Sequence, residues 1–436
     1  MAAPIGSAPA FKTSLFIVRR FNTQIYIFYI ELQKKMHRLG TIMDIAGTND
    51  LTYRYMKVLV VCNNAFSKGN GLHTVMQSLI PRLKDAGLEV RLLAAANEDP
   101  HGPQPEYPLE HFRFPVFDSL ITAHSYGFAK IDDKVIADAV QWADLVHLQE
   151  GFPLESRVAQ VASKAGKGIV GTFHLYSQNI LANALITDKK NFLNDILMYF
   201  WRRYAYDYCS DIHCPTETVR KHLIENGFKA RMTVISNGIE IPETPVKASI
   251  PQSDPIMLLC IGRFAREKSQ MTLIEAMRYS RHAGRIQLHF AGKGPLLDKY
   301  IKAAHQLMTE GILNHPCLFG FYKGEQLKEL ARKAYLNIHC ATVEVEGMSC
   351  LEAIREGTVP LISEGYLAAT SQFALDDRSI FPEQNAKVLA EKIDWWIDHP
   401  EERLRMGQIY ADSARNYDIE KSIARLIEMY RNASAS

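Results

Sequence analysis

Two cations follow a predicted strand in the second half of the chain. The segment Ile261-Gly-Arg-Phe-Ala-Arg-Glu-Lys268 comes directly after an apolar run and leads into a helix-like segment. Gly262 permits a tight turn, so Arg263 and Lys268 would project positive charge from the carboxyl end of the strand. Cations in this position suit a diphosphate, although the same residues would also suit an ordinary solvated loop.

A glycine-rich turn, Ala291-Gly-Lys-Gly-Pro295, also comes directly after a predicted strand. Gly292 and Gly294 would let a ligand approach the backbone amides of this turn. A lone G-x-G motif is weak evidence, so the turn indicates a binding site only together with its neighbours.

A pair of glutamates, Glu344 and Glu352, encloses seven residues that include Gly347, Met348 and Ser349. A helix that starts near Gly347 would offer free amides and the positive end of its dipole to an anion. The two carboxylates would accept hydrogen bonds from paired hydroxyls, such as those of a sugar or a ribose. Ser349 and Glu352 also fit a capping box, which needs no ligand. Each motif is ambiguous by itself. The order of the three motifs, their spacing and their common position after strands are more specific evidence for one binding site.

The elements that would position these motifs begin at Met56. From there, short and continuously apolar runs alternate with helix-like segments, which favours parallel sheets covered on both faces. The predicted strands are 57–62, 89–94, 144–148, 168–172, 211–214, 232–235, 256–261, 286–290, 316–319, 335–339 and 359–362.

A Pro-, Ser- and Lys-rich stretch, 242–255, interrupts this rhythm and is interpreted as a linker between two α/β units. Ligands of open α/β sheets bind beyond the carboxyl ends of the strands, so two facing units would share a deep cleft. The alternative is one doubly wound domain with a long insertion. The predicted parts are an N-terminal extension, an N-terminal Rossmann-like acceptor domain, the linker, a C-terminal Rossmann-like donor domain and a final helix, at 1–55, 56–241, 242–255, 256–415 and 416–436.

The composition of the 436-residue chain is that of an ordinary globular protein, with 47% hydrophobic and 22% charged residues. A net charge of +2 shows no basic excess of the kind that binds nucleic acid. Seven cysteines without a C-x-x-C pair indicate a reducing compartment rather than a disulfide framework or a zinc site. No apolar run approaches the roughly 18 residues of a membrane-spanning helix, so we expect a cytoplasmic protein.

The extension 1–55 contains one short apolar patch, Ile25–Ile30, with Arg19-Arg20 before it and Lys34-Lys35 after it. The patch is too short to cross a bilayer, but it would suit an anchor that lies on a membrane surface. The favoured interpretation is an over-long start, with Met56 as the true first residue.

The three motifs in this order resemble the donor-binding half of the family-4 retaining glycosyltransferases of GT-B fold, and the resemblance covers about 56–432. Val234-Ile-Ser-Asn-Gly-Ile239 and Cys214-Pro-Thr-Glu217 resemble the end of the N-terminal domain of that family. Tyr417-Asp-Ile-Glu420 resembles the start of the C-terminal helix. The resemblance implies an α/β protein with two facing Rossmann-like domains and a C-terminal helix that crosses back to the first.

The resemblance also implies roles for residues of the second half. Arg263 and Lys268 would hold the donor diphosphate, Glu352 the ribose and Glu344 the hydroxyls of the transferred sugar. The backbone amides around Gly347, Met348 and Ser349 would contact the phosphates or the sugar. The turns at Gly262, Gly292 and Gly294 complete the predicted donor site in this domain.

In the first half, Gly171-Thr-Phe-His174 matches the family's active-site histidine, near the sugar and the acceptor. Gly69-Asn-Gly71 matches the first glycine-rich loop, although Asn70 splits the usual pair of glycines. The predicted catalytic set is therefore His174, Arg263, Lys268 and Glu344. A histidine at a strand end is also commonly a satisfied polar residue.

The resemblance implies a nucleotide-sugar donor, most commonly a UDP-sugar, and retention of configuration by attack on the same face of the sugar. It implies no obligatory metal and no cofactor, and the pairs Asp132-Asp133 and Asp376-Asp377 lack the context of a metal site. Arg263, Lys268 and the helix-end amides would stabilise the departing diphosphate. We expect a lipid or polysaccharide-precursor acceptor in cell-envelope glycoconjugate synthesis, with peripheral contact to the inner face of the cell membrane.

Segment 188–208 has an apolar stripe at helical spacing and basic residues near both ends. The stripe comprises Phe192, Ile196, Phe200 and Tyr204, and the basic residues are Lys189, Lys190, Arg202 and Arg203. The favoured interpretation is core packing of one domain face. The alternative is a contact with an anionic membrane surface that would suit a lipid-linked acceptor.

Two other enzyme activities and one non-catalytic function also fit a similar two-domain fold. A nucleotide-sugar epimerase would need no acceptor, and a sugar phosphorylase would hold a lysine-bound pyridoxal cofactor. A binding protein without catalysis would keep the donor site but never release nucleotide. The presence of His174, Arg263, Lys268, Glu344 and Glu352 together favours the transferase.

Overall fold

The computed structural model describes residues 56–63, 65–66, 71–112, 127–183, 191–244, 246–249 and 254–434. The predicted extension 1–55, the loop glycine Gly69 and the lysines Lys189 and Lys190 lie outside these residues.

The first domain is built on a parallel seven-stranded sheet with the order β3-β2-β1-β6-β7-β8-β9. Its strands are β1 (Lys57–Val61), β2 (Glu89–Ala95), β3 (Tyr107–Leu109), β6 (Leu145–Leu148), β7 (Gly168–Thr172), β8 (Asp211–Cys214) and β9 (Arg231–Val234). The helices are α2 (Gly71–Asp85), α4 (Asp133–Trp142), α5 (Pro153–Lys164), α6 (Ser177–Asn183), α7 (Phe192–Tyr204) and α8 (Glu217–Glu225). Alternate residues of β1 enter two separate apolar clusters, one on each face of the sheet, which explains why the strand is apolar throughout.

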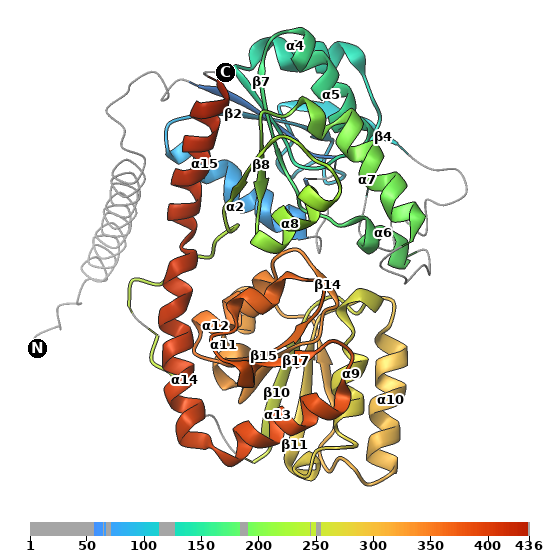
Figure 1. Ribbon diagram of the computed structural model, residues 1–436, viewed down its shortest axis with the longest axis vertical. Helices are drawn as coiled ribbons and strands as arrows, with labels where there is room; N and C mark the ends of the chain where they lie inside the picture. Colours follow the sequence, from blue (N-terminus) through green and yellow to red (C-terminus); the bar gives the residue numbers. More distant parts are fainter. Residues whose placement is uncertain are drawn as a thin grey trace, which may run out of the picture.

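The second domain repeats this plan with a parallel six-stranded sheet of order β12-β11-β10-β13-β15-β17. Its strands are β10 (Ile256–Ile261), β11 (Ile286–Ala291), β12 (Leu318–Gly320), β13 (Leu336–His339), β15 (Val359–Glu364) and β17 (Ile380–Pro382). The helices are α9 (Met271–Ala276), α10 (Leu297–Thr309), α11 (Glu325–Lys333), α12 (Met348–Arg355), α13 (Ala386–Asp398) and α14 (Pro400–Ser413). Figure 1 shows the two domains one above the other.

Every predicted strand is present, with ends that differ by at most two residues, and the single-domain alternative is therefore wrong. Six short strands were not predicted, because two or three residues are too few to establish an apolar pattern. They are β3, β4 (His111–Phe112), β5 (Phe128–Ala129), β14 (Val343–Glu344), β16 (Leu367–Ala368) and β17.

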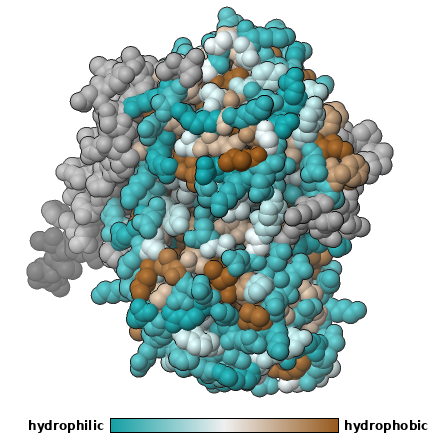
Figure 2. Space-filling model, in the orientation of Figure 1, coloured by the Kyte–Doolittle hydropathy of each residue, from teal (hydrophilic) through white to brown (hydrophobic). Residues whose placement is uncertain are grey.

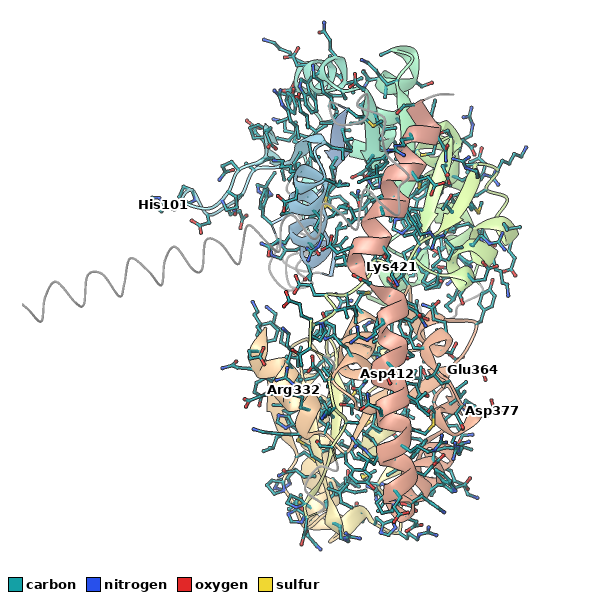
Figure 3. All side chains as sticks on the ribbon, turned by 90° about the vertical axis from the view of Figure 1, so that its left-hand side faces the viewer. His101, Arg332, Glu364, Asp377, Asp412 and Lys421 are labelled. Carbon is teal, nitrogen blue, oxygen red and sulfur yellow. The ribbon has the colours of Figure 1, made fainter. Side chains whose placement is uncertain are left out.

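The final helix α15 (Ile419–Ser434) returns to the first domain, as the sequence predicts. Ile423, Ile427 and Tyr430 are buried in the same apolar cluster as Val58 and Val60 of β1. Figure 1 shows α14 and α15 as a column along one side of both domains, and Figure 3 shows Asp412 of α14 and Lys421 of α15 one above the other on it. The returning helix thereby ties the two domains together on the side away from α7.

The described residues between β9 and β10 form no helix or strand apart from one bridge between Ile239 and Asp418. They are nevertheless packed, because the backbone N–H of Ala248 donates to the side-chain oxygen of Gln408 and the guanidinium of Arg403 donates to the carbonyl of Ser249. The described part of the predicted linker is thus attached along α14. None of the helices in the described residues combines the length and apolar character needed to cross a membrane.

Candidate active site

A cavity of about 1070 Å³ lies between the two domains. The first domain contributes residues from α2, from α6 and from the carboxyl ends of β6, β7 and β8. The second contributes the end of β10, the segment around β14, and α11 and α12. The cavity therefore occupies the place that two facing sheets predict.

Arg263 and Lys268 both line this cavity, and each meets a carboxylate. Arg263 donates to Glu267 at 2.6 Å, and Glu267 is almost fully buried. The backbone of Arg263 is held as well, because Gln270 donates to its carbonyl at 2.8 Å. Lys268 donates to Glu344. The ordinary solvated loop is therefore excluded as an interpretation of this segment.

Gly292 and Gly294 are not among the residues that line the cavity. A Cβ atom at Gly292 would lie 2.0 Å from the carbonyl oxygen of Gly262, and one at Gly294 would lie 2.5 Å from that of Phe264. These two glycines therefore lie behind the Arg263 loop and allow it to pack closely. Gly262 itself does line the cavity, and the donor contacts of Gly292 and Gly294 stay a prediction.

Glu344 is a charged acceptor in the cavity. Burial raises the pKa of Glu344, but the charge of Lys268 and a hydrogen bond from His339 outweigh burial and lower the pKa to about 2. The Nε2 atom of His339 lies 3.4 Å from the Glu344 carboxylate. Glu344 is therefore ionised at neutral pH, which is the state that accepts hydrogen bonds from hydroxyls.

The helix α12 begins at Met348, and Gly347 precedes it in the left-handed region with φ 89°. No side chain caps the helix, so the capping-box interpretation of Ser349 and Glu352 is wrong. The first amides of a helix have no acceptor within it, and Met348 and Ser349 line the cavity. The helix start therefore presents free donors and its positive dipole end to an anion in the cavity.

Glu352 lies one turn inside α12, where it also lines the cavity. Burial raises its pKa, and the nearby charges of Arg355 and Lys328 only partly oppose this. The described residues offer Glu352 no hydrogen bond, in contrast to Glu344. Its carboxylate is available to a ligand.

His174 lies across the cavity from these residues, just after β7. Its Nε2 atom is 2.9 Å from the amide oxygen of Gln149. Burial, together with the neighbouring His213, lowers the pKa of His174 to about 3, so the imidazole is neutral at pH 7. Gly71, at the start of α2, lines the same side of the cavity.

Comparison with known proteins decides the family. The model for Glycosyltransferase Family 4 matches residues 69–242, and that for Glycosyl transferases group 1 matches residues 243–411. The chain belongs to the family-4 glycosyltransferases. It has the GT-B fold, which HepE of Anabaena shares with a TM-score of 0.65 and 17% identity over 86% of this chain and 100% of HepE.

Two further relatives match shorter parts of this glycosyltransferase. An uncharacterized glycosyltransferase of Methanocaldococcus jannaschii is 27% identical over 45% of this chain, and the match spans 53% of that relative's own length. The catalytic domain of cholesterol-alpha-glucosyltransferase from Helicobacter pylori is 42% identical over 37% of this chain and 99% of that domain, with a TM-score of 0.34.

One carboxylate of this glycosyltransferase was missed by the sequence analysis. Glu346 is almost fully buried and accepts hydrogen bonds from Ser236 and from the backbone and side-chain amides of Asn237, the latter two at 3.1 and 2.6 Å. Burial raises its pKa to about 7, although these hydrogen bonds oppose the shift. The contact joins the two domains at the edge of the cavity. The two segments, 234–239 and 344–352, are motifs of the sequence, but nothing in the sequence indicates that they meet.

A row of buried polar side chains under the cavity was also missed. His213 donates from Nε2 to the carbonyl of Ile235 at 2.5 Å, so its Nδ1 must accept the Thr172 hydroxyl at 3.1 Å. Thr172 then accepts from Nε2 of His147, whose Nδ1 accepts the hydroxyl of Tyr430. The carbonyl at one end thus determines the direction of every hydrogen bond in the row.

The apolar stripe of α7 is exposed, which overturns the favoured prediction of core packing. Phe192 is 68% exposed, Phe200 49% and Tyr204 44%. Asn194, Met198 and Trp201 form the buried face of the helix instead. Figure 2 shows hydrophobic residues gathered at the edge of the first domain where α7 lies.

Proposed function

We propose that this glycosyltransferase moves a hexose from a UDP-sugar to a lipid or polysaccharide-precursor acceptor with retention of configuration. The observation that carries the proposal is the grouping of Arg263, Lys268, Glu344 and the start of α12 on one wall of the cavity, with neutral His174 on the other. The first wall suits a diphosphate and a sugar, and the second leaves room for an acceptor.

The charges of the site fit the breaking of a sugar–phosphate bond. The departing diphosphate gains negative charge, which Arg263, Lys268 and the free amides of α12 would stabilise in place. Ionised Glu344 would accept hydrogen bonds from the sugar hydroxyls, and Glu352 from the ribose. The bond from the anomeric carbon to the phosphate oxygen would break, the bond to the acceptor oxygen would form on the same face, and the departing diphosphate would take the proton of the acceptor hydroxyl.

We propose that no metal ion and no cofactor take part, because Arg263 and Lys268 already supply positive charge to the diphosphate. No group of three or more His, Cys, Asp or Glu side chains in the described part of the chain is arranged to hold a metal. Activity should therefore survive a chelator such as EDTA. Its loss, with recovery on adding Mg²⁺ or Mn²⁺, would contradict this part of the proposal.

The proposed nucleotide-sugar donor is tested by measuring nucleotide release from a panel of nucleotide sugars. HepE has been crystallised with UDP-glucose, so UDP-hexoses are the first to try. We expect release from one donor with the natural chain and loss of release in Glu344→Gln and Lys268→Ala. Glu310→Gln, in an exposed ion pair with Arg278, is the matched control and should behave like the natural chain.

Two results would count against this reading. If no donor releases nucleotide and calorimetry detects no nucleotide binding, the assignment of the donor site is refuted. Conversion of the nucleotide sugar without any acceptor would favour an epimerase.

The exposed face of α7 supports a lipid acceptor at a membrane surface. Leu197 on the same helix lines the cavity, as do Ile180 and Leu175, so α7 carries apolar side chains both on its exposed face and at the cavity. Arg202 and Arg203 at the end of α7 add positive charge beside the stripe. We therefore propose that the protein lies at the inner face of the cell membrane. The seven free cysteines suit that reducing side.

Co-sedimentation with liposomes tests this placement. The full chain should bind phosphatidylglycerol vesicles at low salt and bind phosphatidylcholine vesicles less, and Phe192→Ser with Phe200→Ser should reduce binding several-fold. Tyr279→Ser, an equally exposed aromatic of the second domain, is the control. No binding to either vesicle would refute the membrane contact and leave a soluble polysaccharide precursor as the acceptor to test.

A further inference from the structure

Glu344 stands on a very short element. The strand β14 consists of Val343 and Glu344 alone, and it pairs with the two residues of β16 at the end of the second domain that faces the first (Figure 1). The two residue pairs between β14 and β16 fix the backbone of Glu344, but they do not fix the orientation of its flexible side chain. Side chains around Glu344 must do so.

His339, at the end of β13, supplies such a contact from behind the site. It is 4% exposed, and its Nε2 atom lies 3.4 Å from the Glu344 carboxylate and 3.2 Å from the hydroxyl oxygen of Thr370. An ionised carboxylate only accepts hydrogen bonds, so Nε2 must carry the proton. The imidazole is thereby set in one tautomer and turned toward Glu344.

Thr370 extends this contact to the start of α12. It is completely buried, and a Cβ atom at Gly347 would lie 2.2 Å from its hydroxyl oxygen. The hydroxyl therefore lies between the imidazole of His339 and the backbone of Gly347. One buried pair of side chains thus supports both the Glu344 carboxylate and the turn that opens α12.

Lys268 cannot perform this task once a donor is bound. Lys268 already pairs with Glu344, and under the proposed function the donor diphosphate would compete with Glu344 for the same positive charge. His339 and Thr370 are buried away from that competition.

We propose that His339 and Thr370 are positioning residues that hold Glu344 against the transferred sugar and so determine how strongly the sugar half of the donor is bound. This inference rests on the proposed function. It predicts a selective defect, because UDP alone lacks the sugar that Glu344 would contact. Loss of His339 should weaken binding of a UDP-hexose and leave binding of UDP unchanged.

Calorimetry with UDP, UDP-glucose and UDP-galactose on the full chain tests this. We expect His339→Leu to weaken the hexose donor by about tenfold, the value of one hydrogen bond to a charged group, and to change UDP affinity by less than about twofold. His339→Gln places an amide N–H near the position of Nε2 and should restore most of the affinity. Thr370→Val, which keeps the shape without the hydroxyl, should fall between the two. In turnover, His339→Leu should raise KM and lower kcat together, with an unchanged melting temperature as the sign of an intact fold.

The outcomes separate the two proposals. Equal losses for UDP and the UDP-hexose, or no loss for either, would overturn the positioning role while the proposed function stands. A natural chain that binds neither UDP nor any UDP-hexose would overturn the proposed function itself, and the positioning role with it.

Discussion

Three glutamates within nine residues of sequence have three different electrostatic situations. Glu344 has its pKa lowered to about 2 because Lys268 and His339 oppose the effect of burial. Glu346 is paired only with neutral donors, so burial raises its pKa to about 7. Glu352 has a raised pKa and no hydrogen bond within the described chain. The same type of side chain therefore differs in charge and in hydrogen bonding according to its neighbours.

The variant Gly347→Ala tests whether Thr370 restricts the backbone at position 347. The substitution places a Cβ atom 2.2 Å from Thr370 at a φ of 89°, so we expect donor affinity to fall at least tenfold and stability to fall by more than about 1 kcal/mol. Gly311→Ala is the control, because Gly311 has a φ of 70° but open space around it. It should show the backbone cost alone and normal donor binding by calorimetry. Equal behaviour of the two variants would show that Thr370 does not restrict this position.

At the scale of elements, the row from Tyr430 to His213 connects α15 to the strands under the cavity. It crosses β6, β7 and β8 and ends at the carbonyl of Ile235, next to the loop that holds Glu346. Burial lowers the pKa of His213 to about 4 and also lowers that of His147, so both are neutral near pH 7. The returning helix is therefore attached by a directed hydrogen bond as well as by apolar packing.

Tyr430→Phe tests that attachment. Removing the hydroxyl leaves Nδ1 of His147 buried without its donor, so we expect a loss of about 1–2 kcal/mol in stability and a lower melting temperature. Tyr279→Phe, at an exposed position, should be neutral. If the two variants melt alike, the hydrogen-bond row contributes nothing to holding α15.

At the scale of the whole molecule, polar contacts join the domains beside the cavity. Glu346 meets Ser236 and Asn237, and Tyr366 of the second domain donates to Glu225 of the first at 2.6 Å. Val343 and Leu367 of β14 and β16 are buried within an apolar cluster of the first domain. The segment from Val343 to Glu346 is therefore attached to both domains, so its position depends on how they are arranged.

The titration of Glu346 gives this arrangement a pH dependence. Its pKa in the folded chain, about 7, lies above that of an exposed glutamate, so the folded state binds the extra proton. The contribution of Glu346 to stability is thus most favourable below about pH 4.5 and falls as pH rises toward 7. We expect the stability of the natural chain relative to Glu346→Gln to drop by on the order of 2 kcal/mol between pH 5 and pH 8 in denaturant unfolding. A difference between the natural chain and Glu346→Gln that does not change with pH would refute the assignment.

The sequence by itself determined the two parallel sheets, the returning helix and the placement of Arg263, Lys268, Glu344 and α12 after strands. Those features follow from local apolar continuity and from motifs a few residues long. Only the tertiary structure decided that Gly292 and Gly294 pack behind the loop and that the apolar stripe of α7 faces outward. It also decided that Glu346 meets a loop 109 residues earlier in the chain and that His147 meets Tyr430, 283 residues later. Such contacts depend on which surfaces the folded domains bring together, because residues so distant in sequence leave no periodic signal in either segment.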